Sequence, residues 1–160
     1  MRKRDELADY FEENAKEDIF DYIPPQRTNQ IYTPKKVVKQ MVDYLEEENP
    51  NCFDDPKATF IDLYMKSGLY ITEIVKRLYR SEKMIELYPN EDERLKHIFE
   101  NQVYGCAPTE IIYAIATHYI LGFSKDKDIK ISSNHFKLFD TLPSAQAGTL
   151  EEDLDKLFKE

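Results

Sequence analysis

The chain has 160 residues, of which 33% are charged and 41% hydrophobic, and its formal net charge is −9. This length suffices for one globular domain with its own core, and no apolar run approaches the ~20 residues that span a bilayer. Basic residues are outnumbered and interleaved with acids, as in residues 125–128, so we do not expect this chain to hold a nucleic acid by itself.

The amino-terminal residues predict a helix followed by a linker. Residues 5–20 place apolar side chains at helical spacing between acids, and Pro24-Pro25 ends any helix and starts an extended stretch through Thr33. We therefore expect two parts: residues 1–27 as an amino-terminal helix and linker, and residues 28–160 as the main domain.

A second helix and a first strand follow. Thr33-Pro34 supplies a hydroxyl N-cap and a proline at the first helical position, and Asn49-Pro50-Asn51 ends the apolar periodicity after it. Residues Thr59 to Leu63 are nearly all apolar. This pattern predicts a strand buried on both faces of a parallel sheet.

The central part of the chain predicts a helix from Tyr70 to Arg80, a break at Ser81 and a continuation to Leu87. Residues 89–92 read as a turn and residues 93–99 as a short helix. Residues 102–105 are a candidate second strand, and Pro108 opens the next helix.

The last part predicts a short third strand at residues 129–132, a loop from Asn134 to Gly148, and a helix that starts at Thr149 with acids in its first turn. Strands that alternate with helices indicate an α/β fold with a parallel sheet flanked by helices.

Cysteine and histidine do not indicate a metal site. Cys52 and Cys106 are far apart without CxxC spacing, so we expect reduced thiols in a cytoplasmic protein. The histidines at positions 97, 118 and 135 are equally scattered. The basic start at residues 1–5 has no apolar segment behind it and is not a secretory signal.

The segment with most functional information is the predicted strand that ends in Asp62, its loop, and the helix behind it. Ser67 and Gly68 could present backbone amides to a ligand at the helix start, with Asp62 accepting hydrogen bonds from the ligand. The alternative is that this segment binds no ligand and is a polar strand end followed by a tight turn. Neither GxGxxG nor GxxxxGK[ST] occurs, which argues against NAD and ATP.

Three further segments, residues 30–42, 103–111 and 135–142, change this interpretation. With the loop, and in this order, they resemble the adenine-specific (N6) DNA methyltransferases of restriction–modification systems, which use S-adenosylmethionine. That family carries a YTP segment before a helix, a D-P-x-x-G-S-G loop, a G-x-(D/E)-x-x-P strand end, an F-x-x-x-D type segment and a catalytic (D/N)-P-P-Y. The resemblance covers residues 28–142 and implies a Rossmann-like methyltransferase fold.

The resemblance also implies which residues bind the cofactor. By motif they are Tyr32, Thr33, Pro34, Asp62, Ser67, Gly68 and Asp140. The first three would line the methionine end, the next three would form the main cofactor loop, and the last would lie near the exocyclic amine of the adenine ring. As alternatives, Thr33-Pro34 is an ordinary helix cap and Asp140 an ordinary turn acid.

This chain departs from the family pattern at three positions. Leu63 replaces the proline of the loop and Lys66 replaces its first glycine. Ala107 stands where the family has the acid that holds the ribose hydroxyls, and Glu110, one helical turn on, is an imperfect substitute. Loss of a charge-assisted contact costs ~1.5–3 kcal/mol, or about one to two orders of magnitude in affinity. We therefore expect weak cofactor binding.

No N-P-P-Y or D-P-P-Y tetrapeptide occurs, so we expect no catalytic residues within this chain. The hypothesis is an amino-terminal, S-adenosylmethionine-binding part of a methyltransferase, inactive alone, whose DNA contacts lie in regions outside this chain. The main alternative is a non-catalytic interaction module that keeps the fold without cofactor binding, and a third option is an unrelated α/β fold. A partial sheet would have an open edge, which suggests a homodimer or restriction–modification subunits as partners.

Overall fold

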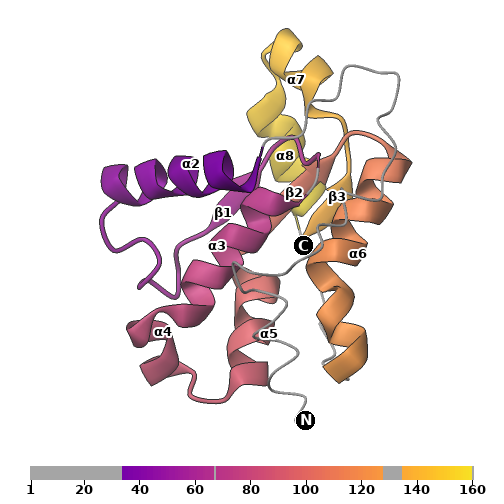
Figure 1. The fold of residues 1–160 in the computed structure, drawn as a ribbon. Coiled ribbons are helices and arrows are strands. Elements are labelled where there is room, and N and C mark those ends of the chain that lie inside the picture. Colours follow the sequence, from indigo (N-terminus) through magenta and orange to yellow (C-terminus); the bar gives the residue numbers. More distant parts are fainter. Residues whose placement is uncertain (1–33, 67, 128–134, 160) are drawn as a thin grey trace.

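The computed structural model describes residues 34–66, 68–127 and 135–159 (Figure 1). The elements in chain order are α2 (Lys35–Glu48), β1 (Phe60–Asp62), α3 (Leu69–Arg80), α4 (Glu82–Leu87), α5 (Glu91–Asn101), β2 (Val103–Ala107), α6 (Glu110–Lys127), β3 (Phe136–Leu138), α7 (Thr141–Ala147) and α8 (Leu150–Phe158). The helix expected at residues 5–20 and the strand expected at residues 129–132 lie outside the described residues.

The three strands form one parallel sheet in the order β1-β2-β3. The chain passes from β1 to β2 through α3, α4 and α5, and from β2 to β3 through α6, as parallel strands require. Figure 1 shows α3, α5 and α6 beside the sheet, with α2 lying across the upper part of α3. The expected parallel sheet flanked by helices is therefore present.

The core lies between the sheet and its helices, on the face that carries Phe60, Val103 and Phe136. These side chains are at most 9% exposed, and Phe136 meets Phe99 edge-on with ring centroids 6.4 Å apart. On the opposite face, Ile61 is 42% exposed. The expectation that this strand is buried on both faces is wrong, because the face that carries Ile61 is only partly covered by the described helices.

Helix α2 begins close to the expected position. Pro34 has φ −59° and ψ 147°, and its carbonyl accepts hydrogen bonds from the N–H groups of Val37 and Val38. The proline therefore occupies the cap position and precedes the first helical residue, Lys35, whereas we expected it one position further in. Thr33, the expected cap, lies outside the described residues. The helix ends at Glu48 with Asn49 as its C-cap, as the sequence predicts.

The middle helices agree with the sequence, with one correction. The break at Ser81 separates α3 from α4, where the Ser81 hydroxyl accepts a hydrogen bond from the Met84 N–H. Helix α5 starts earlier than expected, and residues 91 and 92 are helical. The Asn90 side chain causes this, because it accepts hydrogen bonds from the N–H groups of Asp92 and Glu93.

The largest correction concerns residues 134–148, which were expected to form a loop. They contain β3 and α7. Strand β3 has only three residues, with Lys137 between two apolar ones, so its sequence carries little periodic signal. Helix α8 agrees with the prediction. Within the described ranges, no helix has the length and apolar character needed to cross a membrane.

Candidate functional site

The carboxyl ends of the three parallel strands lie at one edge of the sheet, and hydrogen bonds join the segments that follow them. The Met65 N–H, in the loop after β1, donates to the Cys106 carbonyl of β2 at 2.8 Å. The Phe139 N–H, after β3, donates to the Ala107 carbonyl at 2.7 Å. The Thr141 hydroxyl donates to the Leu63 carbonyl, also at 2.7 Å. This edge is where open parallel sheets bind ligands.

Asp62 stands at this edge as the last residue of β1. Its Oδ1 accepts a hydrogen bond from the Tyr64 N–H at 3.2 Å, which turns the chain away from the strand. Burial raises the pKa of the Asp62 carboxyl, and this single backbone bond lowers it only in part. A carboxylate held in this way gains stabilisation when a ligand donates a hydrogen bond to it.

Cys106 lies on the neighbouring strand and is fully buried. Burial, with the Asp62 charge as a smaller cause, raises the pKa of its thiol to about 11. A thiol with this pKa is protonated at neutral pH, so Cys106 is not a nucleophile at this edge.

Gly68 has φ +75° and starts α3, so its backbone favours glycine. A Cβ placed on it would lie 2.8 Å from Cδ1 of Ile120 on α6. The glycine therefore allows the close packing of α3 against α6. Its carbonyl accepts hydrogen bonds from both the N–H and the hydroxyl of Thr72. Ser67 lies outside the described residues.

The loop between Asp62 and Gly68 is anchored by Met65, which the sequence did not indicate. Its side chain is fully buried, and a Cβ on Gly105 would lie 2.4 Å from its Sδ. Gly105 therefore leaves the space in the middle of β2 that the thioether fills. A glycine inside a predicted strand is a signal of such a close approach. The neighbouring Lys66 is half-buried.

The remaining expected site residues have local structural roles or lie elsewhere. Asp140 is exposed and caps α7, because its Oδ1 accepts a hydrogen bond from the Leu142 N–H at 3.1 Å. Glu110 is exposed in the first turn of α6, and Pro34 is exposed before α2. Tyr32 and Thr33 fall outside the described residues. The edge thus contains Asp62, Gly68 and Asp140, and Figure 1 shows the start of α2 at the same end of the sheet.

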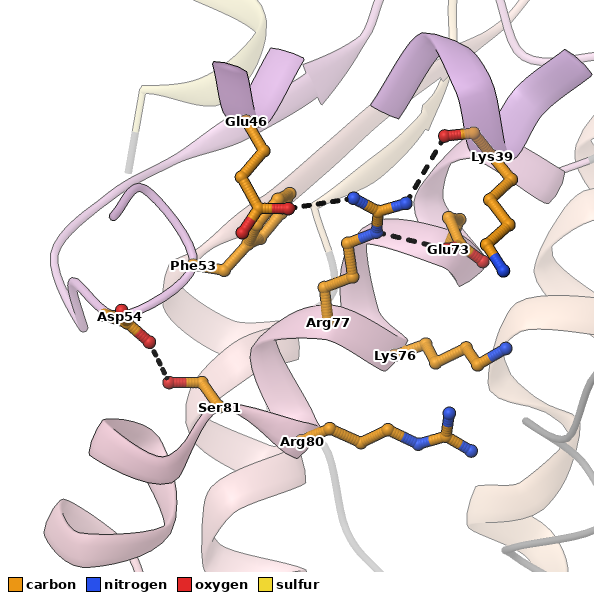
Figure 2. A pocket seen from close by; sticks show the side chains of 9 residues that line it. All are labelled: Lys39, Glu46, Phe53, Asp54, Glu73, Lys76, Arg77, Arg80 and Ser81. Carbon is orange, nitrogen blue, oxygen red and sulfur yellow. Dashed lines mark hydrogen bonds and ion pairs between the residues drawn. The ribbon is translucent and has the colours of Figure 1, made fainter. Parts of the chain in front are cut away.

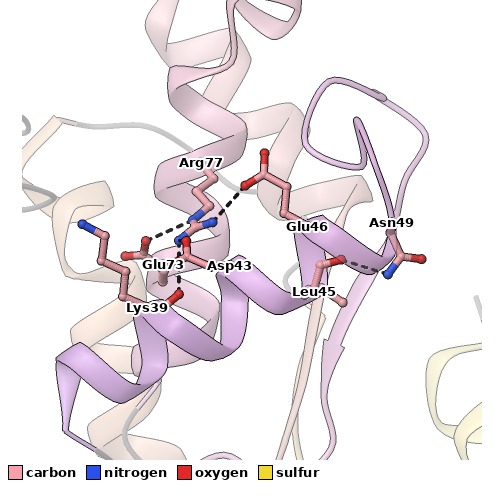
Figure 3. Close-up of polar contacts among 7 residues, drawn as sticks. All are labelled: Lys39, Asp43, Leu45, Glu46, Asn49, Glu73 and Arg77. Carbon is pink, nitrogen blue, oxygen red and sulfur yellow. Dashed lines mark hydrogen bonds and ion pairs between the residues drawn. The ribbon is translucent and has the colours of Figure 1, made fainter.

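Arg77 fixes α2 against α3 and was also not identified from the sequence (Figure 3). Its guanidinium bonds Asp43 at 2.5 Å, Glu46 at 2.9 Å and Glu73 at 3.1 Å, and also the Lys39 carbonyl at 3.3 Å. Burial disfavours the charge of this side chain, but the hydrogen bonds to Asp43 and Glu73 raise its pKa overall. The i,i+4 spacing of Glu73 and Arg77 was the available sequence signal.

No cluster of three or more His, Cys, Asp or Glu side chains suited to a metal ion occurs among residues 34–66, 68–127 and 135–159. The site therefore offers a half-buried carboxylate, backbone amides at the start of α3 and an exposed acid across the edge. These groups can bind a polar organic ligand through hydrogen bonds.

Comparison with known proteins gave one significant similarity. The chain is 26% identical over 108 residues to an "Uncharacterized adenine-specific methylase" of Mycoplasma pneumoniae (strain ATCC 29342 / M129 / Subtype 1). The match covers 68% of this chain and 25% of that protein, so the chain spans about a quarter of its length. No family model matches the chain. No solved structure matches it either.

Proposed function

We propose that this chain is the S-adenosylmethionine-binding part of an adenine-specific DNA methyltransferase with a partial Rossmann-like fold. The observation that carries the proposal is the position of Asp62, at the carboxyl end of β1 and one short loop before the glycine that starts α3. The similarity to a protein named as an adenine-specific methylase supports the same assignment.

The described residues fit the ribose hydroxyls of the cofactor less well than its other polar groups. The Asp62 carboxylate and the amides of the first α3 turn suit a ligand that carries hydroxyl, amino and carboxylate groups. At the end of β2, however, Ala107 offers no side-chain acceptor and its carbonyl already accepts the Phe139 N–H. The exposed Glu110 is the nearest acid along the chain for the ribose hydroxyls. This incomplete set predicts weak binding.

When bound, S-adenosylmethionine supplies a sulfonium methyl group for transfer to a nucleophilic nitrogen. The (D/N)-P-P-Y tetrapeptide that would orient an adenine amine does not occur in the sequence. DNA recognition and methyl transfer, including any role in restriction–modification, are therefore assigned to polypeptide outside this chain. We propose that the chain alone binds the cofactor without methylating DNA.

Calorimetric titration with S-adenosylmethionine up to millimolar concentration tests the proposal. We expect saturable binding that Asp62→Asn abolishes, since asparagine keeps the shape and removes the charge. Asp92→Asn is the matched control, because Asp92 is an exposed acid in the first turn of α5. Equal binding by the Asp62→Asn variant, or DNA methylation by the isolated chain, would refute the proposal.

One observation favours a second candidate function, a non-catalytic interaction module with the same fold. Met65 fills the space over Gly105 and ties the loop to β2, and Lys66 stands where the family has glycine. Because the Met65 side chain holds this loop against β2, less of the loop backbone is open to the approach of a cofactor. Absence of heat and of any thermal shift at millimolar cofactor, in a folded protein, would support this candidate over the first.

A further inference from the structure

Helix α2 carries an apolar stripe on its exposed side. Val37, Met41 and Tyr44 follow one another at spacings of four and three residues, and they are 39%, 49% and 65% exposed. This spacing places the three side chains in one line along the helix. Val38 and Val42, in contrast, are buried in the core. The helix therefore has two apolar faces, and only one of them is used by the core.

The stripe points away from the rest of the domain. The opposite side of α2 faces α3, where Arg77 bonds Glu46 and the Lys39 carbonyl (Figure 2). At about 100° per residue, Glu46 lies on the far side of the helix from Val37. Figure 1 shows α2 at the periphery of the described part of the fold. The stripe is therefore a surface for contact with a partner.

The charges of α2 run against its own dipole. The helix begins with Lys35 and Lys36 and ends with three glutamates at residues 46–48, and it has no acid in its first turn and no base in its last. The amino terminus of a helix carries a partial positive charge and its carboxyl terminus a partial negative one, so both groups of side chains disfavour the isolated helix. Each end has the charge that would complement the other end.

A second α2 in the antiparallel direction satisfies both features. With a two-fold axis at Met41, Val37 of each copy lies opposite Tyr44 of the other, and the two stripes meet along their length. Lys36 and Glu47 are exposed on the same border of the stripe, so Lys36 of each copy comes near Glu47 of the other. A parallel pair would instead bring like charges together.

We propose that α2 is a homodimer interface, in which the stripe packs antiparallel on the stripe of a second copy of this chain. One pair of 14-residue helices buries less than the ~800 Å² per partner of a standard interface, so the dimer is weak and depends on concentration. The contact does not involve the strands, and it is independent of the proposed cofactor binding.

Sedimentation equilibrium of the full chain, from about 10 μM to 1 mM, tests the proposal. We expect a monomer–dimer equilibrium within this range. Met41→Glu places two carboxylates at the two-fold axis and should leave only monomer. Ile85→Glu is the matched control and should leave the dissociation constant unchanged, because Ile85 is a comparably exposed apolar residue on α4, 42% exposed. Circular dichroism checks that both variants are folded.

Exchange of the border charges tests the antiparallel direction. K36E and E47K should each weaken the dimer on the order of tenfold, because the two-fold axis turns two attractive surface pairs into repulsive ones. The variant K36E/E47K restores both pairs with their signs reversed, and its dissociation constant should return close to that of the parent. In a parallel dimer the double variant would not be restored in this way.

Four results would overturn the proposal. A chain that stays monomeric up to 1 mM would show that the stripe does not pair, and a lower urea midpoint of Met41→Glu in that case would show that another segment of the same chain covers it. A dimer that Met41→Glu leaves intact would place the interface elsewhere. Equal weakening by Ile85→Glu would show unspecific association, and a K36E/E47K dimer no tighter than the single variants would refute the antiparallel pairing.

Discussion

The close approach of Met65 to Gly105 predicts that Gly105→Ala destabilises the fold. A Cβ at this position would lie 2.4 Å from Sδ of Met65, 3.0 Å from its Cε and 3.0 Å from Cδ1 of Phe136. All three atoms belong to fully or almost fully buried side chains, so the methyl group cannot be accommodated by a shift toward solvent. Gly105 has no positive φ, and the effect is therefore one of packing and not of backbone strain.

The expected size follows from overpacking of a buried core, which costs about 1–3 kcal/mol. For a domain of this length each kcal/mol lowers Tm by roughly 2–4 °C. Urea unfolding followed by far-UV circular dichroism measures the change, since the chain has no tryptophan for fluorescence. The midpoint should fall without a change in the m-value, because the same surface is exposed on unfolding.

A double-mutant cycle with Met65→Ala tests the cause. Met65→Ala alone should cost about 2–5 kcal/mol because it leaves a cavity. Combined with Gly105→Ala it should cost less than the sum, since the new methyl group then enters space that the thioether left. Additive effects, or a cost for Gly105→Ala below about 0.5 kcal/mol, would refute the contact between these two residues.

Three further predictions concern charged and thiol groups. Arg77→Ala should lower the free energy of unfolding by about 1–2 kcal/mol, and by less at high salt, because its partner acids are partly solvated. As a control, Lys83→Ala removes an exposed ion pair with Glu86 and should cost almost nothing. Asp62 has a raised pKa in the fold, so the folded state binds its proton more tightly than the unfolded state and stability falls as pH rises above about 3.9. Asp62→Asn should therefore be more stable than the parent at pH 7, and the difference should disappear below about pH 3.9. An unchanged pH profile would contradict this. Cys106 should resist iodoacetamide at pH 8 until urea unfolds the chain, while the partly exposed Cys52 reacts first; equal rates in the native state would contradict the burial of Cys106.

The sequence predicted the elements whose ends carry strong local signals. Helix α2 has proline at its start and an Asn-Pro-Asn end, and α3 and α4 are separated at a serine that caps the second of them. Strand β1 and Asp62 were identified from an apolar run that ends in an acid. These features depend on neighbouring residues only, which is why a single sequence contains them.

The features that the sequence did not predict depend on contacts between distant residues. Whether Ile61 is covered depends on which helices pack on its face of the sheet, which the sequence of β1 does not encode. Strand β3 is too short for a period-2 pattern, and its existence depends on pairing with β2. The packing of Met65 on Gly105 joins positions 40 residues apart, and only the fold brings them together.

The candidate site was predicted in part for the same reason. The positions of Asp62 and Gly68 at the sheet edge follow from local sequence, whereas the approach of Ile120 to Gly68 does not. The sequence left open that Asp140 is an ordinary turn acid, and in the structure its Oδ1 accepts a hydrogen bond from the Leu142 N–H as the cap of α7. The contribution of Asp140 to a ligand stays a prediction.

The bonds of Arg77 to both α2 and α3 have a consequence for the entropy of ligand binding. The two helices begin at the same end of the sheet, and the guanidinium, with Val38 and Val42 buried beneath α2, joins them into one rigid unit. A ligand that contacted both helix starts would find their separation already set. It would lose its own translational and rotational freedom, but the protein would lose little, so even a sparse set of hydrogen bonds could give measurable affinity.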